Sequence, residues 1–264
     1  MSGHGFLRQF HRALHDWWRD QSRQRGIAGA TTLLAHELWE FLRDSTPERR
    51  RRRFGDMEYD WEHHVNTTSG TVAWRERLLG VFLSAYQPTE PAAFQEMMRA
   101  LKINFSDYTF VDLGSGKGRT LLMASEYPFR RVIGVELLPE LHQAAVHNIS
   151  DYKSPTQLCS QVESVCSDAS RFPLPDDPLL LYLFNPLPES SLQQVMLNLE
   201  DSLRRKPRDV GIVYHNPILE GQLNQLPWLK MARHGDHYAI FVHESSWGLL
   251  GGRSPAASKI VSAW

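Results

Sequence analysis

The spacing of apolar residues predicts helices over most of the first third of the chain. Over residues 6–18 the apolar side chains recur at helical intervals and arginines occupy the rest of the helix surface, which predicts an amphipathic helix. A second helix is predicted over residues 32–42, after a break at Gly26 and Gly29, and a third over residues 72–85. We therefore expect a mostly helical N-terminal cap.

From about residue 90 the pattern changes to helices that alternate with short apolar strands, which is typical of a parallel sheet covered by helices on both faces. The predicted strands are 109–113, 131–136, 162–166, 179–185, 210–214, 229–234 and 238–243. The predicted helices are 90–101, 119–127, 139–149 and 189–203. The strand over 179–185 is apolar on both faces, as expected at the centre of a sheet, and the last two strands should form a hairpin.

The fold class predicted from this order is α/β. We expect a doubly wound, mostly parallel seven-stranded sheet with a C-terminal antiparallel hairpin and an N-terminal helical cap. The cap is placed at residues 1–85, the sheet domain at 86–245, and a flexible tail rich in glycine, serine and alanine at 246–264.

Composition excludes some classes of protein and favours a cytoplasmic one. The 264 residues include 29 basic and 30 acidic side chains, so net charge does not indicate nucleic acid or an anionic membrane as the partner. Cys159 and Cys166 have neither metal-ligand nor redox spacing, which suits a reducing compartment. No apolar run approaches the roughly 20 residues that span a bilayer, and the start lacks a secretory signal pattern.

The stretch FVDLGSGKGRT, residues 110–120, predicts a ligand site. Gly114, Gly116 and Gly118 allow the chain to turn tightly after a strand and to approach a ligand without a Cβ in the way. A helix follows the turn, and its first amides are free to bind that ligand.

Two acidic residues define the kind of ligand. Glu136 ends the next strand twenty residues after Gly116, where a carboxylate accepts the hydroxyls of a ribose. Asp112 precedes the turn, and Arg119 stands where a dinucleotide-binding motif would have its third glycine. An acid before the turn suits a cationic nucleoside ligand better than a pyrophosphate.

These residues resemble those of class I S-adenosylmethionine-dependent methyltransferases. Residues 112–118 resemble the family's first motif, Gly134-Val135-Glu136 its ribose-binding acid, and Ser167-Asp168-Ala169 the loop that contacts the adenine. The resemblance covers residues 86–245 and implies S-adenosyl-L-methionine as the methyl donor, with S-adenosylhomocysteine as the product. The cofactor-binding residues that it implies are Tyr86, Thr89, Asp112, Gly114, Ser115, Gly116, Gly118, Glu136, Asp168, Ala169 and Asn185.

Within the family, the chain is most similar to bacterial methyltransferase-domain proteins of unnamed substrate. Tyr86-Gln87-Pro88-Thr89 also resembles an element that closes the cofactor pocket in seven-strand lysine methyltransferases. The resemblance does not extend to the cap.

Two residues are candidates for catalysis. Asn185-Pro186-Leu187-Pro188 resembles the motif with which related enzymes grip an acceptor nitrogen, but it lacks that motif's second proline and its aromatic residue. This departure argues against a planar acceptor such as adenine. His215 follows the fifth strand, and an imidazole that titrates near neutrality could deprotonate the acceptor. A structural turn and a solvated histidine remain the alternatives.

The segment over residues 54–70 is polar, aromatic and rich in turn formers, and we expect it to cover the pocket as a lid. The substrate or lid residues that we select in it are Tyr59, Trp61, His64, Asn66 and Thr67. His63-His64 is not a metal-ligand spacing, and no metal is expected. Arg49–Arg53 could bind phosphate groups of a nucleic acid, although a solvated charge run is the simpler interpretation.

The function predicted from the sequence is N-methylation of a protein side chain, such as a lysine-like amine, or of a small molecule. Two alternatives stay open: a non-catalytic cofactor-binding or scaffold module, and an NAD-dependent oxidoreductase. The methyl acceptor, the methylated atom and the oligomeric state do not follow from the sequence.

Overall fold

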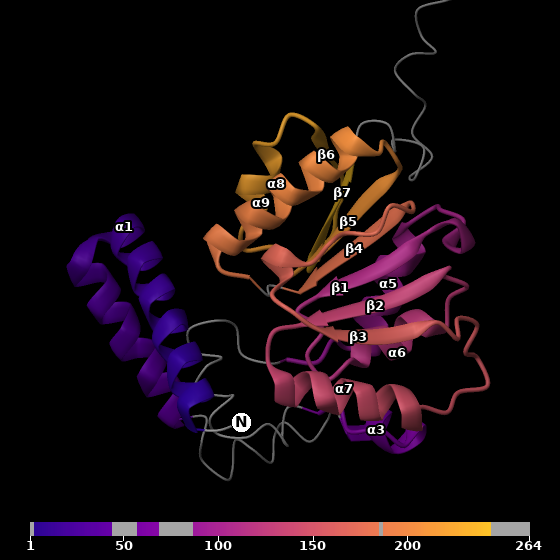
Figure 1. Ribbon diagram of the computed structural model, residues 1–264, viewed down its shortest axis with the longest axis horizontal. Coiled ribbons are helices and arrows are strands. Elements are labelled where there is room, and N and C mark those ends of the chain that lie inside the picture. The colour runs from indigo at the N-terminus through magenta and orange to yellow at the C-terminus, as the bar shows by residue number, and fades with distance from the viewer. Residues whose placement is uncertain (1–2, 44–56, 69–86, 185–186, 244–264) are drawn as a thin grey trace, which may run out of the picture.

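The computed structural model describes residues 3–43, 57–68, 87–184 and 187–243, and it is organised around one seven-stranded sheet (Figure 1). The strands are β1 (Thr109–Leu113), β2 (Arg131–Glu136), β3 (Val162–Cys166), β4 (Leu179–Phe184), β5 (Val210–His215), β6 (Leu229–His234) and β7 (Tyr238–His243). Their order across the sheet is β3-β2-β1-β4-β5-β7-β6. The first five strands are parallel, and β7 runs antiparallel between β5 and β6. The predicted fold class is confirmed.

Helices cover both faces of the sheet. α5 (Pro91–Ala100), α6 (Arg119–Ser125) and α7 (Pro139–Asp151) lie on one face, with the 3-10 turn η3 (Phe105–Asp107) leading into β1. α8 (Glu189–Arg205), α9 (Glu220–Asn224) and the turn η4 (Ala169–Arg171) lie on the other. The sequence predicted neither α9 nor the two 3-10 turns, because elements this short do not show a helical period.

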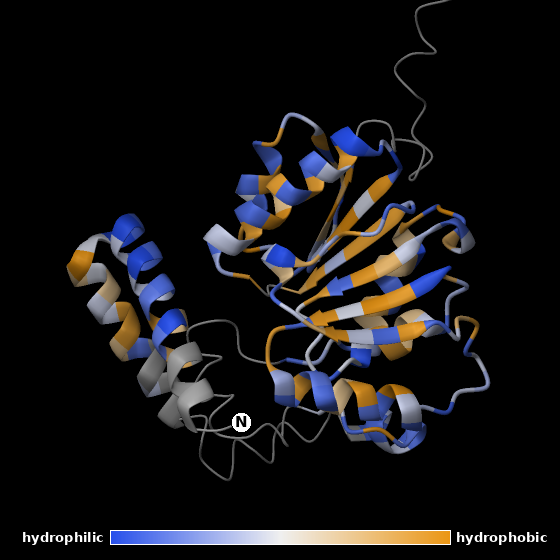
Figure 2. Ribbon diagram, viewed as in Figure 1, coloured by the Kyte–Doolittle hydropathy of each residue, from blue (hydrophilic) through white to orange (hydrophobic). Residues whose placement is uncertain are grey.

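The alternation of side chains along the strands divides the core into two layers. Phe110, Tyr182 and Val213 face α5 and α6, whereas their neighbours Val111 and Leu181 face α8. The first five residues of β4 are all buried, since this strand lies between two parallel neighbours and under helices on both sides. Figure 2 shows the same result as a band of apolar residues along the central strands.

The cap is a helical hairpin. α1 (Gly3–Arg43) is helical on both sides of Gly26, whose φ of 72° and ψ of 170° turn the chain, so that the two arms lie side by side (Figure 1). The break was predicted, but the predicted helices over 6–18 and 32–42 were too short. Residues 19–25 are polar on all sides and therefore carry no apolar period, although they continue the first arm.

The hairpin packs on the carboxyl end of the sheet. Leu138 and Leu141, at the start of α7, are buried against apolar side chains of α1: Phe10, Ala13, Leu14, Trp17 and Leu34. A second contact joins the hairpin to the start of α8, where Ser190 donates a hydrogen bond to Asp20 at 3.3 Å and Gln24 donates one to Glu189.

The segment predicted to be rich in turns contains a helix, α3 (Met57–His63). That part of the prediction was wrong, because the helix is mostly polar and shows no apolar period, although Asp60 is buried and Tyr59 is partly buried. Four predicted features lie outside the described residues: the helix over residues 72–85, Tyr86, the tail over 246–264 and Arg49–Arg53.

Within the described part, no helix combines the length and the apolar character needed to cross a bilayer.

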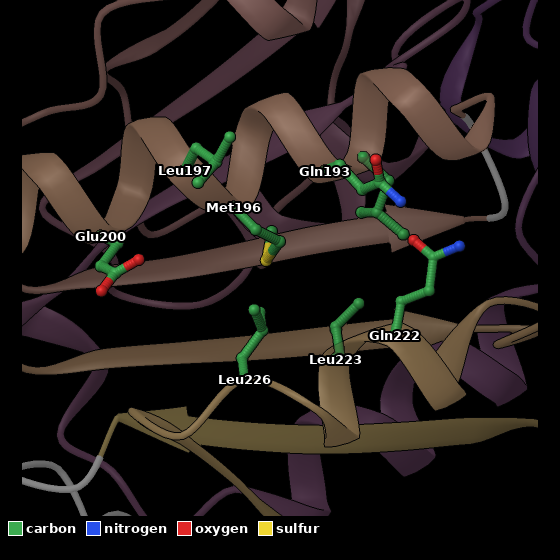
Figure 3. A pocket seen from close by; sticks show the side chains of 8 residues that line it. Gln193, Met196, Leu197, Glu200, Gln222, Leu223 and Leu226 are labelled. Carbon is green, nitrogen blue, oxygen red and sulfur yellow. The ribbon is translucent and has the colours of Figure 1, made fainter.

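A hollow of about 260 Å³ lies between α8 and α9, on the face of the sheet opposite α6 (Figure 3). Its walls are mainly aliphatic, and the residues that line it are Leu192, Gln193, Met196, Leu197, Glu200, Gln222, Leu223 and Leu226. Its lining shares no residue with the glycine turn.

Gly134 of β2 is closely packed beside the glycine turn. A Cβ on Gly134 would lie 2.5 Å from Leu121 Cδ1 and 2.6 Å from Ser115 Oγ. Gly134→Ala should therefore lower the free energy of unfolding by about 1–3 kcal/mol, as overpacking does in a close-packed core. Urea denaturation followed by circular dichroism measures this change. Gly221→Ala is the matched control, because a Cβ there meets nothing within 4 Å, and it should be neutral or stabilising. Equal stability of Gly134→Ala and the wild type would contradict the packing argument.

Candidate functional site

The glycine turn between β1 and α6 has a backbone that only glycine adopts readily. Gly114, Gly116 and Gly118 have φ values of 90°, 55° and 84°, in the left-handed region. The amides of Gly114 and Ser115 donate to the carbonyl of Val135 at 2.8 and 3.1 Å, which fixes the turn over the end of β2. Gly118 is the residue before the first turn of α6, so the free amides of α6 lie at the carboxyl edge of the sheet.

Glu136 holds the two loops of this edge together. One carboxylate oxygen, Oε2, accepts a hydrogen bond from the amide of Gly116 at 2.8 Å, and Oε1 accepts one from the amide of Leu138 at 2.7 Å. The side chain is 6% exposed. The structure thus brings together Gly116 and Glu136, which were selected from the sequence by their spacing.

Asp112 is a buried acid beside the turn. Burial raises its pKa to about 8, and the nearby charge of Glu136 adds to this effect, while a hydrogen bond from Thr120 opposes it. Asp112 is therefore largely protonated near neutral pH in this structure. A cation bound next to it would favour the ionised form, so the site combines a neutral resting state with an affinity for positive charge.

A chain of hydrogen bonds crosses the sheet next to Asp112. Thr89 Oγ1 lies 3.0 Å from Tyr182 Oη, and Tyr182 Oη lies 2.8 Å from His215 Nδ1, with all three side chains buried. Tyr182 pairs with Asp112 in the register of β1 and β4. Thr89 and His215 were selected from the sequence and Tyr182 was not, although a single hydroxyl in the run LLLYLF was a signal that could have found it.

The expectation that His215 titrates near neutrality was wrong. Burial, together with a smaller effect of the neighbouring His237, lowers its pKa to about 4. The imidazole stacks on Phe184, with ring centroids 4.0 Å apart and 19° between the planes. His215 is therefore a neutral imidazole held in a fixed orientation by Tyr182 and Phe184. It accepts protons more weakly than an exposed histidine.

The loop after β3 reaches the same edge. The amide of Ser167 donates to the carbonyl of Glu136 at 2.9 Å. Asp168 Oδ1 accepts hydrogen bonds from the amide and the hydroxyl of Ser170, at 2.9 and 2.7 Å, and so caps the turn η4 that begins at Ala169. Asp168 and Ala169 are thus beside Glu136, but the hydrogen bonds of Asp168 here are local ones. Asn185 follows β4 and lies outside the described residues, as Tyr86 does.

The five residues selected as a lid are divided between the interior and the surface. Tyr59 lies under the guanidinium of Arg119, with its ring centroid 5.1 Å from Arg119 Cζ. Thr67 Oγ1 accepts a hydrogen bond from Arg119, and the main-chain amide of Asn66 donates one to Asn148. Trp61 is 75% exposed, and His64 and Asn66 are also exposed. The segment therefore packs against the turn and α6, and three of its selected residues are exposed.

Two residues at this contact were not predicted from the sequence. Arg119, the first residue of α6, and Asp60 of α3 form an ion pair at 3.2 Å with 1% and 4% of their side chains exposed. No local pattern indicates that either charge is buried, since the partners are 59 positions apart.

Among the described residues, no group of three or more histidine, cysteine, aspartate or glutamate side chains is arranged to hold a metal ion. The candidate site is built instead from backbone amides, two carboxyl groups and a buried tyrosine–histidine pair.

Comparison with known proteins gives structural neighbours but no relatives by sequence. The chain matches no protein-family model and no curated protein. A putative methyltransferase from Escherichia coli is 16% identical over 60% of this chain and 88% of its own, with a TM-score of 0.45. A dimethyladenosine transferase from Plasmodium falciparum is 14% identical, over 61% of this chain and 65% of its own, with a TM-score of 0.44.

An RNA methyltransferase from Salinibacter ruber, solved with S-adenosyl-L-homocysteine, is 20% identical over 60% of this chain and 92% of its own. Its TM-score is 0.36. These identities and scores are too low to assign a function or a substrate.

The raised pKa of Asp112 predicts how stability depends on pH. Between its ordinary value of 3.8 and about 8, the unfolded chain has released a proton that the folded protein keeps, so the free energy of unfolding falls as pH rises. Asp112→Asn removes this dependence. The difference in unfolding free energy, wild type minus variant, should fall with pH by up to about 1.4 kcal/mol per unit.

Urea denaturation at several pH values between 5 and 7.5 measures this difference, and other titrating groups cancel in it. Asp201→Asn is the control, because Asp201 is 63% exposed and should leave the pH profile unchanged. A difference that stays constant or rises with pH would contradict a raised pKa.

Proposed function

We propose that this protein is an S-adenosylmethionine-dependent methyltransferase that transfers a methyl group to a nitrogen of a protein side chain, such as a lysine-like amine, or of a small molecule. One observation carries the proposal: the glycine turn, Glu136 and Asp112 lie together at the carboxyl edge of a doubly wound sheet, with the carboxylate of Glu136 bound to Gly116. Ligands of such sheets bind at this edge.

The residues present fit the cofactor that the sequence resemblance implies. Glu136 would accept the ribose hydroxyls, and the loop at Asp168 and Ala169 would contact the adenine. Asp112 and the turn would bind the cationic amino-acid end. The hydroxyl of Ser115 is buried in the turn and has no hydrogen-bond partner in the described part of the protein, so it is a polar group that a ligand would satisfy. When bound, the cofactor supplies a methyl group on a positively charged sulfur.

The sheet also argues against the oxidoreductase alternative. A dinucleotide-binding sheet extends its order from strands 3-2-1-4-5 to a sixth parallel strand, whereas here antiparallel β7 lies next to β5. The acid before the turn also suits a cation better than a pyrophosphate, because only a bound cation would favour the ionised form of Asp112. The sheet with its antiparallel hairpin has the form that the methyltransferase resemblance implies.

The acceptor nitrogen would lie near the ends of β4 and β5. His215 is neutral at physiological pH, and in a neutral imidazole one ring nitrogen can accept a proton. With Nδ1 bonded to Tyr182, the ring would orient an amine rather than act as a strong base. Methyl transfer depends chiefly on placing a neutral nucleophile in line and excluding water, so a weak acceptor suffices. Asn185 would bind the same nitrogen.

The test is transfer of labelled methyl groups from S-adenosylmethionine to protein, RNA and metabolite fractions incubated separately with the purified chain. Label in a protein or metabolite fraction supports the proposal, and label in RNA alone would overturn the acceptor class. Cofactor binding without transfer to any fraction would favour a non-catalytic module. Binding of NAD without binding of S-adenosylhomocysteine would overturn the cofactor.

Glu136→Ala should weaken binding of S-adenosylhomocysteine, since the ribose loses its acceptor and Gly116 loses its hydrogen bond. The expected loss is on the order of 1–3 kcal/mol, measured by titration calorimetry. Glu163→Ala is the control, because Glu163 is a half-exposed carboxylate on the neighbouring strand β3. Unchanged affinity in Glu136→Ala would contradict the ribose assignment.

Asn185→Ala and His215→Ala should reduce turnover more than cofactor affinity, because both residues are assigned to the acceptor. A tenfold or larger fall in kcat is expected for each, in the range of a lost orienting or proton-accepting group. Steady-state kinetics on the acceptor found in the screen, together with calorimetry, separates the two effects. Wild-type turnover in both variants would contradict a role of Asn185 and His215 in binding or orienting the acceptor.

A further inference from the structure

The glycine turn is held from outside the sheet by residues of the N-terminal region. Asp60 accepts hydrogen bonds from the amides of Thr67 and Thr68 at 2.7 and 2.9 Å and from the hydroxyl of Thr67. Its Oδ1 also accepts one from Arg119 Nη2 at 3.2 Å. The carboxylate of Asp60 therefore holds residues 60–68 in a compact loop, and it also binds Arg119 of α6.

Arg119 connects this folded segment to the turn. Its Nε donates to Thr67 Oγ1 at 2.6 Å, and its guanidinium lies over the ring of Tyr59. Arg119 is also the residue directly after Gly118, so its main chain forms the first turn of α6. The side chain faces the N-terminal segment and the main chain belongs to the proposed cofactor site, which makes one residue the link between them.

Two further hydrogen bonds tie the same segment to the turn. Lys117 Nζ donates to the carbonyl of Thr68 at 2.9 Å. Asn148 of α7 donates to the carbonyls of Lys117 and Asn66, at 2.8 and 3.0 Å, and accepts from the amide of Asn66 at 2.8 Å. The turn is thus held between β2, α7 and a segment more than 45 positions away in the sequence.

We propose that Asp60 and Arg119 are positioning residues for the cofactor-binding turn, and that docking of residues 57–68 and binding of the cofactor stabilise each other. This inference rests on the proposed function for its ligand. The three glycines allow the turn several backbone conformations, and the buried ion pair between Asp60 and Arg119 favours one of them. Because a coupling between two binding events is reciprocal, cofactor binding also stabilises the docked segment.

The first measurement needs no ligand. Hydrogen–deuterium exchange of the amides in residues 114–120 reports how firmly the turn is held. Arg119→Lys keeps the positive charge but replaces the fork that reaches both Thr67 and Asp60 by a single ammonium. We expect exchange in 114–120 to be at least about fivefold faster in this variant. Arg130→Lys is the matched control, since Arg130 forms an exposed ion pair with Asp177 and should change nothing.

Thr67→Val is a second variant for the same exchange measurement, and it is used if Arg119→Lys does not fold. Valine keeps the shape of threonine and removes the hydroxyl that joins Asp60 to Arg119, without leaving a changed charge in the interior. It should also speed exchange in 114–120. Wild-type exchange at the turn in a folded Arg119→Lys or Thr67→Val protein, with a change confined to residues 57–68, would overturn the positioning role.

The second measurement uses S-adenosylhomocysteine. In the wild type it should slow exchange in residues 60–68, and its affinity should be at least about fivefold lower in Arg119→Lys than in Arg130→Lys. Affinity equal to that of the wild type despite a loosened turn would refute the coupling. Failure of the wild type to bind S-adenosylhomocysteine would instead refute the proposed function, while the ligand-free exchange result would still decide whether the pair positions the turn.

Discussion

The site depends on one carboxylate that bridges two backbone segments. Glu136 ends β2 and accepts amides from the glycine turn before it in the chain and from the loop after it. Both loops approach each other because the parallel strands β1 and β2 end at the same edge. A glycine-rich turn has high conformational entropy, so a buried acceptor that binds its amide selects one shape. Asp112, on the neighbouring strand β1, has a raised pKa because burial disfavours its charged form, and the nearby negative charge of Glu136 adds to this effect.

Features that depend on period and topology were predicted from the sequence. The strand bounds of β1, β2, β3, β6 and β7 agree with the prediction. Short segments with apolar residues between turn formers mark strands even at the partly exposed β3 and β6. The proximity of Glu136 to Gly116 could be inferred from two parallel strands joined by a helix. Each of these inferences uses residues close together in the chain or a rule about how neighbouring strands connect.

The features that escaped prediction are polar and long-range. Asp60 and Arg119 look like ordinary surface charges, and only the folded chain shows them buried against each other. In the sequence, Tyr182 is an aromatic residue of the kind common in strands. Only the structure shows that its hydroxyl lies between Thr89 and His215. The low pKa of His215 has the same origin, because burial is a property of the surrounding structure and not of the turn sequence. Periodicity locates apolar burial, but it carries no information about which polar groups are enclosed with it.

The N-terminal region packs directly on the sheet domain, across the boundary that the sequence predicted near residue 85. Composition and period change there, yet α1 covers Leu138 and Leu141 directly after Glu136, and α3 supplies the countercharge of Arg119. A chain shortened to the sheet domain would expose two leucines at the mouth of the site and leave a guanidinium enclosed without its carboxylate. The N-terminal region thus supplies apolar packing and a countercharge directly beside the candidate site.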